Sequence, residues 1–254
     1  MRIHFPRNTL NALQAIAIAM LFFALPYNGS LKAEETLSKE DVRTIVREYL
    51  IENPEILIEV QEALEQKQQA EMAISQQQTI QENFEAIYAS PYQIVFGNPE
   101  AEKTIVEFFD YNCGFCKRAL EDMQQFIELD PDVRFILKEF PVLGEASLEA
   151  SRVSMAFSKV MPEKYPEFHV ELLSMEGLKD GARAIQLAES MGADTQKLIT
   201  EMENPEILDA IQEIYGIANG LGITGTPSYI AGSEVVFGAV GYSQLKQAVE
   251  SQTN

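Results

Sequence analysis

The chain has 254 residues and a formal net charge of −20, with 39 acidic residues against 19 lysines and arginines. Such an excess of negative charge repels nucleic acid and anionic membrane surfaces, so we expect no nucleic-acid partner. Only two cysteines are present, which excludes a cysteine-dense fold held together by disulfides. The length after an N-terminal leader allows one large domain or one domain with an additional arm.

Residues 1–33 have the pattern of a secretory signal peptide. Arg2 and Arg7 supply a positive start, and an unbroken apolar run of eleven residues covers 15–25. That run is too short for a membrane span, which needs about 20 residues, and Leu31-Lys32-Ala33 offers a cleavage site. An uncleaved N-terminal anchor is the alternative. We therefore expect an exported, periplasmic protein; removing three cations and no acid takes its charge from −20 to −23.

Residues 34–90 have the composition of a helical arm. Ser38-Lys39-Glu40-Asp41 is like a capping box, and Asn53-Pro54-Glu55 offers a second N-cap with proline at the first helical position. The absence of glycine and proline after that point predicts one helix over 54–88. Its thin apolar stripe would not fold well alone, so we expect a homo-oligomer, a dimer or trimer; a loosely attached arm is the alternative. The stripe consists of Ile56, Val60, Ala63, Ala70, Ile74, Phe84 and Tyr88.

Residues 91–254 predict a single α/β domain. A strand over 103–109, a helix over 114–129 and a strand over 133–140 form a βαβ unit with a parallel strand pair. Helical segments then fill about residues 145–221, and a strand–strand–helix pattern follows Pro227. The other predicted elements are a short strand at 92–96, helices at 145–160, 164–175, 180–191, 194–202 and 204–219, strands at 228–231 and 234–237, and a helix at 242–251.

Cys113 and Cys116 lie where the first strand of the βαβ unit ends and its helix begins. The positive end of a helix stabilises a thiolate at this position, and the thiolate is the form that attacks disulfides. Cys113, at the helix start, is therefore the expected nucleophile. Cys116, one turn further on, is the expected resolving sulfur, so that the pair forms a redox-active disulfide.

Three other interpretations of the cysteine pair compete with this one. A structural disulfide would close a very short loop and stabilise the fold little. A structural zinc ion needs about four Cys or His ligands, whereas residues 34–254 offer only these two cysteines and His169. Two inert buried cysteines would make their position a coincidence. We therefore expect a redox site with no metal and no cofactor.

The segment from Phe108 to Lys117, with the sequence FFDYNCGFCK, resembles the active-site segment of the DsbA-like thiol:disulfide oxidoreductases. Residues 138–144 resemble the segment after the second core strand of that family, and Gly225-Thr226-Pro227 resembles its cis-proline loop. The helix that starts at Asn53 resembles the arm of the branch related to suppressor-of-copper-sensitivity protein C. The resemblance covers about residues 38–252 and implies a thioredoxin fold with a helical insertion, preceded by an N-terminal helical arm.

The resemblance also implies roles for residues beyond the cysteines. Pro227 would follow a cis peptide bond opposite Cys113, and Thr226 would offer its backbone to an extended substrate, like one added strand. Glu107 would be a buried acid below Cys116 that helps to move a proton, with Lys138 as a candidate ion-pair partner. A solvent-facing strand carboxylate is the alternative for Glu107.

These features predict an exported thiol–disulfide oxidoreductase that acts on cysteine-containing exported proteins. The dipeptide Gly114-Phe115 is closer to the Gly-Tyr of disulfide isomerases than to the Pro-His of the strongest oxidant, and Thr226 also fits the isomerase and reductase pattern. We therefore expect an isomerase that a membrane thiol-redox partner keeps reduced. A dithiol oxidase and an oligomeric chaperone-like binding module with a vestigial CxxC are the alternatives.

Overall fold

The computed structural model describes residues 37–250, so the predicted signal peptide over residues 1–33 lies outside the described residues. The chain divides into two compact units, one up to Gln61 and one from Glu62 onward, and each is described by itself. Within residues 37–250, no helix is both long enough and apolar enough to span a membrane.

The first unit contains α2 (Lys39–Glu52) and the start of α3 (Ile56–Glu82). The predicted capping box is confirmed, because Ser38 Oγ accepts the Asp41 N–H at 3.2 Å and the Asp41 carboxylate accepts the Ser38 N–H at 2.9 Å. Asn53 does not cap the next helix as predicted. Its backbone N–H and side-chain amide both donate to the Tyr49 carbonyl, at 2.9 and 2.8 Å, and so end α2. α3 therefore begins after the Pro54 turn, at Ile56.

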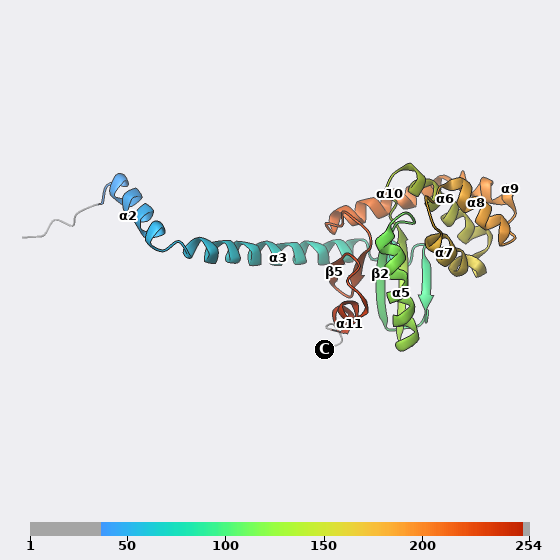
Figure 1. The fold of residues 1–254 in the computed structure, drawn as a ribbon, viewed down its shortest axis with the longest axis horizontal. Helices are drawn as coiled ribbons and strands as arrows, with labels where there is room; N and C mark the ends of the chain where they lie inside the picture. Colours follow the sequence, from blue (N-terminus) through green and yellow to red (C-terminus); the bar gives the residue numbers. More distant parts are fainter. Residues whose placement is uncertain (1–36, 251–254) are drawn as a thin grey trace, which may run out of the picture. The chain divides into compact units, whose positions relative to one another are not determined.

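The second unit is built on a five-stranded sheet in the order β1-β3-β2-β4-β5. β2 and β3 are parallel and are joined through α5, as the predicted βαβ unit requires, while β1, β4 and β5 run antiparallel to their neighbours. Figure 1 shows α5 in front of β2. The bounds are β1 (Ile94–Gly97), β2 (Lys103–Phe109), α5 (Gly114–Leu129), β3 (Val133–Glu139), β4 (Ser228–Ala231), β5 (Glu234–Phe237) and α11 (Tyr242–Glu250).

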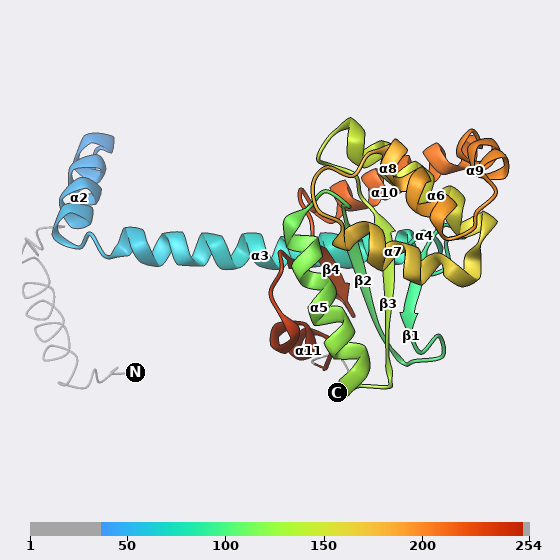
Figure 2. The same cartoon turned by 45° about the vertical axis from the view of Figure 1, so that its right-hand side comes forward.

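A run of helices separates β3 from β4, as the predicted helical insertion requires. Figure 2 shows α6, α7, α8 and α9 gathered at one end of the unit, while α10 returns the chain to the sheet. The elements are α6 (Glu145–Val160), the short 3₁₀ helix η1 (Pro162–Lys164), α7 (Tyr165–Ser174), α8 (Gly181–Ser190), α9 (Thr195–Met202) and α10 (Pro205–Gly220). This combination of sheet order, α5 crossover and inserted helices is the predicted thioredoxin fold.

Both faces of the sheet are covered, because alternate residues of a strand point to opposite sides. Ile105 and Phe109 face a core shared with α5, α7 and α11. Val106 and Phe108 face a second core with α10, α4 (Phe84–Tyr88) and the last part of α3. A strand that is buried on both faces reads as the continuous apolar run seen in the sequence.

The end of α3, which lies within the predicted arm range of residues 34–90, packs in this second core. Ile80 and Ile87 are buried there, and Gln76 Nε2 donates to the Leu221 carbonyl at 2.8 Å. The single helix predicted over 54–88 is interrupted at Asn83, whose side-chain amide donates to the Thr79 carbonyl at 2.8 Å. Side chains of this type compete with the helical backbone for hydrogen bonds.

The packing of α3 predicts that replacing two of its isoleucines by alanine lowers the free energy of unfolding by different amounts. Ile80 is 8% exposed, whereas Ile74, a member of the predicted stripe, is 57% exposed. We expect Ile80→Ala to lower the free energy of unfolding by about 2–4 kcal/mol through a cavity, and Ile74→Ala to change it by no more than about 0.5 kcal/mol. Urea unfolding of the mature protein measures both, and equal costs would contradict the packing.

Candidate active site

The central strand β2 leads directly into the loop that carries the first cysteine. After Phe109 the chain turns through residues 110–112, and Cys113 occupies the N-cap position of α5 with extended backbone angles. The Cys113 N–H donates to the Asp110 carbonyl at 3.0 Å, which closes the turn. The buried strand and the helix start together fix the position of the cysteine.

Asp110 holds this loop in place. Its fully buried carboxylate accepts the Asn112 N–H at 2.8 Å, the Ser147 hydroxyl at 2.7 Å and the Leu143 N–H at 2.9 Å. Three donors satisfy the buried charge and connect the active-site loop to the segment after β3. The sequence analysis missed this role; an acid that directly ends a buried apolar strand was the available signal.

The two cysteines are chemically unequal thiols. Cys113 is 7% exposed and Cys116 is fully buried. A hydrogen bond from the Cys116 thiol lowers the pKa of Cys113 to about 5. Burial opposes this shift, while the Thr226 side chain and the backbone N–H groups of Cys116 and Phe115 add to it. Burial, the hydrogen bond with Cys113 and the nearby Glu107 raise the pKa of Cys116 far above its ordinary value. Cys113 is thus the sulfur that this geometry favours as a thiolate.

The predicted cis-proline loop lies against Cys113. The Thr226–Pro227 peptide bond is cis, and Cys113 Sγ donates to the Thr226 carbonyl at 3.2 Å. Ser228, the first residue of β4, pairs with Phe108 of β2, and this antiparallel pairing brings the two distant segments together. The structure therefore brings four predicted site residues, the two cysteines, Thr226 and Pro227, to one place.

Glu107 faces the cysteine side of the sheet and is 4% exposed, which rules out the solvent-facing alternative. Burial, then the nearby Cys113 and Asp122, raise the pKa of Glu107 to about 8. Its carboxyl receives no hydrogen bond from the part of the chain that the structure describes. This side chain is therefore mostly protonated at neutral pH and gains its charge as the pH rises through about 8.

The expected pairing of Lys138 with Glu107 is wrong. Lys138 is the β3 partner of Phe108, not of Glu107, so its side chain lies on the opposite face of the sheet. Its ammonium donates to the Ala86 carbonyl at 2.6 Å and to Gln93 Oε1 at 2.8 Å. Burial lowers the pKa of Lys138 to about 7.

A buried polar cluster lies behind the active-site loop. The Tyr111 hydroxyl contacts Ser154 Oγ at 2.7 Å and His169 Nδ1 at 3.1 Å, and Glu139 accepts a hydrogen bond from Ser151 at 2.7 Å. Burial lowers the pKa of His169 to about 3, so this imidazole packs as a neutral group. Between residues 37 and 250, no group of three or more His, Cys, Asp and Glu side chains could hold a metal ion.

The rim around Cys113 combines apolar and basic side chains. Phe115 is 56% exposed, and the Arg118 guanidinium lies 4.2 Å from the centre of its ring. Lys117 forms an ion pair with Glu176 of the α7–α8 loop. The same loop is tied to Asn112, whose side chain accepts the Lys179 N–H and donates to the Lys179 carbonyl, each at 2.8 Å.

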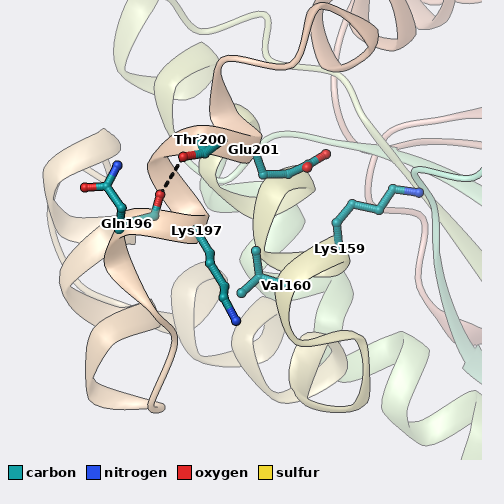
Figure 3. Close-up of a pocket in the computed structure, with 6 residues that line it drawn as sticks. All are labelled: Lys159, Val160, Gln196, Lys197, Thr200 and Glu201. Atoms are coloured by element: carbon teal, nitrogen blue, oxygen red, sulfur yellow. Dashed lines mark hydrogen bonds between the residues drawn. The ribbon is translucent and has the colours of Figure 1, made fainter.

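A separate hollow between α6 and α9 lacks comparable chemistry. Its lining includes no thiol or imidazole, and Figure 3 shows that its drawn hydrogen bond, from Thr200 Oγ1 to the Gln196 carbonyl, is internal to α9. The Lys159 ammonium donates to the Pro91 carbonyl at 3.0 Å. We assign no site to this hollow, which is lined by Lys159, Val160, Gln196, Lys197, Thr200 and Glu201.

Solved structures of similar sequence share this architecture. A thioredoxin-like oxidoreductase from Silicibacter pomeroyi DSS-3 is 38% identical, with a TM-score of 0.63 over 66% of this chain and 96% of the other. Proteus mirabilis ScsC in a compact conformation is 31% identical, with a TM-score of 0.61 over 85% and 98% of the two chains. The curated Bacillus subtilis disulfide bond formation protein D is 23% identical over 170 residues, which cover 63% of this chain and 77% of that protein.

A thioredoxin-type sheet with a CxxC dithiol at a helix N-terminus, opposite a cis-proline, defines the class of thiol–disulfide oxidoreductases. The profile described as DSBA-like thioredoxin domain matches residues 104–250, and the profile described as copper resistance protein ScsC N-terminal domain matches residues 39–71. The chain belongs to the DsbA-like thioredoxin-domain family, as the sequence resemblance implied.

The unequal thiols predict a pH profile for alkylation. In the reduced mature protein, iodoacetamide should modify Cys113 with an apparent pKa of about 5 and leave Cys116 unmodified. Cys116→Ala should raise that value, because it removes the foremost cause of the low pKa of Cys113. Mass spectrometry of the alkylated peptides measures both.

The same protein unfolded in guanidinium serves as the control, because both thiols should then titrate near ~8.5. Preferential labelling of Cys116 in the folded protein would overturn the assignment of the nucleophile.

Proposed function

We propose that this protein is an exported disulfide isomerase and reductase that acts on cysteine-containing proteins through the Cys113–Cys116 dithiol. The observation that carries the proposal is the position of Cys113 Sγ at the N-terminus of α5, 3.2 Å from the Thr226 carbonyl, with Cys116 buried beside it. Residues 1–33 would be removed as a signal peptide. The mature protein would consist of a helical arm and a catalytic domain over 91–254.

The chemistry follows from the order of the two sulfurs. The Cys113 thiolate attacks one sulfur of a substrate disulfide, forms a mixed disulfide and releases the other substrate sulfur as a thiolate. In isomerisation a different substrate thiolate then attacks the mixed disulfide and frees Cys113. In reduction Cys116 attacks Cys113 instead, which releases the reduced substrate and leaves the Cys113–Cys116 disulfide. A membrane thiol-redox partner would return that disulfide to the dithiol.

We assign Thr226 and Pro227 to substrate positioning. The Thr226 backbone lies beside Cys113, with its carbonyl 3.2 Å from Sγ, and an extended substrate segment would pair with this backbone as an added strand. Such pairing uses main-chain groups and is therefore tolerant of sequence. That tolerance suits an enzyme that acts on many partly folded proteins.

We assign Glu107 to proton transfer with Cys116. Cys116 must lose its proton as it attacks, and its raised pKa opposes this. A carboxyl with a pKa of about 8 in the same buried space can accept that proton. The acid exchanges protons near neutral pH because burial has moved its pKa upward.

The isomerase direction rests on two features of this chain. The dipeptide Gly114-Phe115 resembles that of isomerases, and α2 carries an exposed apolar face. In the first unit a groove is lined mostly by Val42, Val46, Leu50, Ile51 and Leu57. Burying such surface against another copy would stabilise an oligomer by about 25 cal/mol per Å². Two or more active sites around a shared space would be screened from an oxidising membrane partner.

One observation favours the second candidate function, a dithiol oxidase. A thiolate with a pKa of about 5 stabilises the reduced form of the protein, which makes its disulfide a better oxidant. A strong oxidant of this kind has a potential of about −120 mV, and weaker ones lie at roughly −200 mV or below. The redox potential and the refolding of a scrambled substrate together separate the two functions.

The role of Glu107 predicts a slower second step in Glu107→Gln. In the wild type, the rate at which Cys116 resolves a mixed disulfide should rise with pH through about 8, as the carboxylate forms. In the variant that rise should be absent, and the rate above pH 8 should be about 10- to 100-fold lower. Quenched-flow with a peptide disulfide measures this step.

Alkylation of Cys113 below pH 7 should be unchanged in Glu107→Gln, because the wild-type carboxyl is protonated there. Glu102→Gln, the same change at an exposed site before β2, is the control for loss of one acid. Equal resolution rates in all three proteins would remove Glu107 from the mechanism.

If the groove is buried between copies, the double variant Val46→Asp with Leu57→Asp should be a monomer, because it places two charges in the groove. Light scattering measures the oligomeric state. This double variant should still reduce insulin but should fail to refold scrambled ribonuclease, because the shared space is lost. Thr44→Asp adds a carboxylate to α2 outside the groove and should stay oligomeric and active.

A mature wild-type protein that is monomeric at tens of micromolar would sink the isomerase proposal and favour the oxidase. Client protection that survives in Cys113→Ser with Cys116→Ser would instead favour a binding module.

A further inference from the structure

Basic side chains gather beside the active site of this strongly acidic chain. Lys117 lies in the first turns of α5, four residues after Cys113, and Lys179 and Arg183 come from the α7–α8 loop and the start of α8. Lys117 pairs with Glu176 of the loop that carries Lys179, and Arg183 donates to two backbone carbonyls of the same loop, so the three cations gather around one loop. Burial and then the nearby Lys117 lower the pKa of Lys179. A net charge of −20 makes such a local cluster unexpected.

Lys179 is held next to Cys113 by its own backbone. Asn112, the residue before the nucleophile, accepts the Lys179 N–H and donates to the Lys179 carbonyl, each at 2.8 Å. Arg183 Nη1 steadies the same loop by donating to the Glu176 and Leu178 carbonyls at 2.7 and 2.8 Å. These bonds give Lys179 a fixed position at the edge of the site.

The ammonium of Lys179 has no partner within residues 37–250, although most of the residue is buried. The residue is 7% exposed, and its side chain makes no hydrogen bond or ion pair with any residue from 37 to 250. Both nearby carboxylates are engaged elsewhere, since Asp110 accepts three hydrogen bonds within the loop and Glu176 pairs with Lys117. The ammonium itself therefore reaches solvent, and an incoming carboxylate can pair with it through a charge-assisted hydrogen bond.

The partner of Lys117 is easily exchanged. The Glu176 side chain is 92% exposed, whereas that of Lys117 is 36% exposed. An exposed ion pair of this type contributes about 0–1 kcal/mol, so a substrate carboxylate can replace Glu176 at little cost. The replacement would then contact Lys117 and the unpartnered Lys179 together.

We propose that Lys179 and Lys117 form a carboxylate-binding subsite that selects substrates with an acidic residue next to the reacting cysteine. The inference rests on the proposed function, since the substrate sulfur must bond to Cys113. Residues of an extended strand rise about 3.3 Å each, so a neighbouring Asp or Glu side chain lies within reach of the subsite. The occupant is a peptide carboxylate, which a charge-assisted hydrogen bond to an ammonium holds.

The test uses two peptides, Ala-Asp-Cys-Asp-Ala and Ala-Asn-Cys-Asn-Ala, each as a mixed disulfide with neutral 2-thiopyridine. The reduced mature protein attacks the peptide sulfur, and released thiopyridone reports the rate. The Asp-to-Asn rate ratio, divided by the same ratio for dithiothreitol, removes differences in intrinsic reactivity. It also cancels any change in the pKa of Cys113, which affects both peptides alike.

We expect a normalised ratio of about 10 in the wild type, the equivalent of about 1.4 kcal/mol. Lys179→Gln and Lys117→Gln should each reduce it to about 2 or less. Lys246→Gln, the same charge change at a partly exposed residue of α11 that pairs with Glu250, should leave it at about 10. Work near physiological salt screens the general acidic surface beyond ~8 Å and retains direct contacts.

A wild-type ratio near 1, or one that both active-site lysine variants leave unchanged, would overturn the subsite. Lys117→Gln alters a half-exposed side chain, so it decides the matter even if Lys179→Gln does not fold. Failure of the protein to react with either peptide would instead count against the proposed function. Equal reaction with both would count against the subsite alone.

Discussion

The pairing of β2 with two different neighbours is the constraint on which the active site depends. β2 is parallel to β3 and antiparallel to β4, so the end of β2 and the start of β4 meet at one edge of the sheet. Cys113 follows that end of β2, and Pro227 precedes that start of β4. The contact of 3.2 Å between Cys113 Sγ and the Thr226 carbonyl therefore joins residues that are 113 positions apart in the chain.

Asp110 and Glu107 are both buried near the cysteines, but their different surroundings give them different roles. Asp110 accepts three hydrogen bonds and thereby fixes the active-site loop. Glu107 is almost as deeply buried but receives none from residues 37–250, and burial raises its pKa to about 8. The first arrangement holds the loop in one conformation. The second leaves a group that gains and loses a proton near neutral pH, which is the property that the proposed second step requires.

The sequence patterns predicted the secondary structure of the catalytic unit closely and that of the arm less well. β2, α5, α6, β4 and β5 have the predicted bounds, because buried strands and capped amphipathic helices leave clear local patterns. In the arm, the side-chain amides of Asn53 and Asn83 each donate to a backbone carbonyl four residues earlier. These hydrogen bonds lie where α2 and α3 end. Ile80 and Ile87, outside the predicted stripe, are buried against the sheet, and Tyr88 of the stripe packs against the same core. The apolar pattern of a helix does not specify which other element will cover it.

Local patterns and the family resemblance predicted the elements of the thioredoxin fold, the CxxC dithiol at the start of a helix, and the loop with Thr226 and Pro227, because residues that are neighbours in the chain carry each of these signals. The partners of the buried polar groups, by contrast, were set by tertiary packing. It separated Lys138 from Glu107 by the two faces of the sheet, engaged Asp110 with Ser147 and Leu143, and brought Lys179 beside Asn112. Those contacts depend on strand register and on how inserted helices pack, which no local pattern encodes.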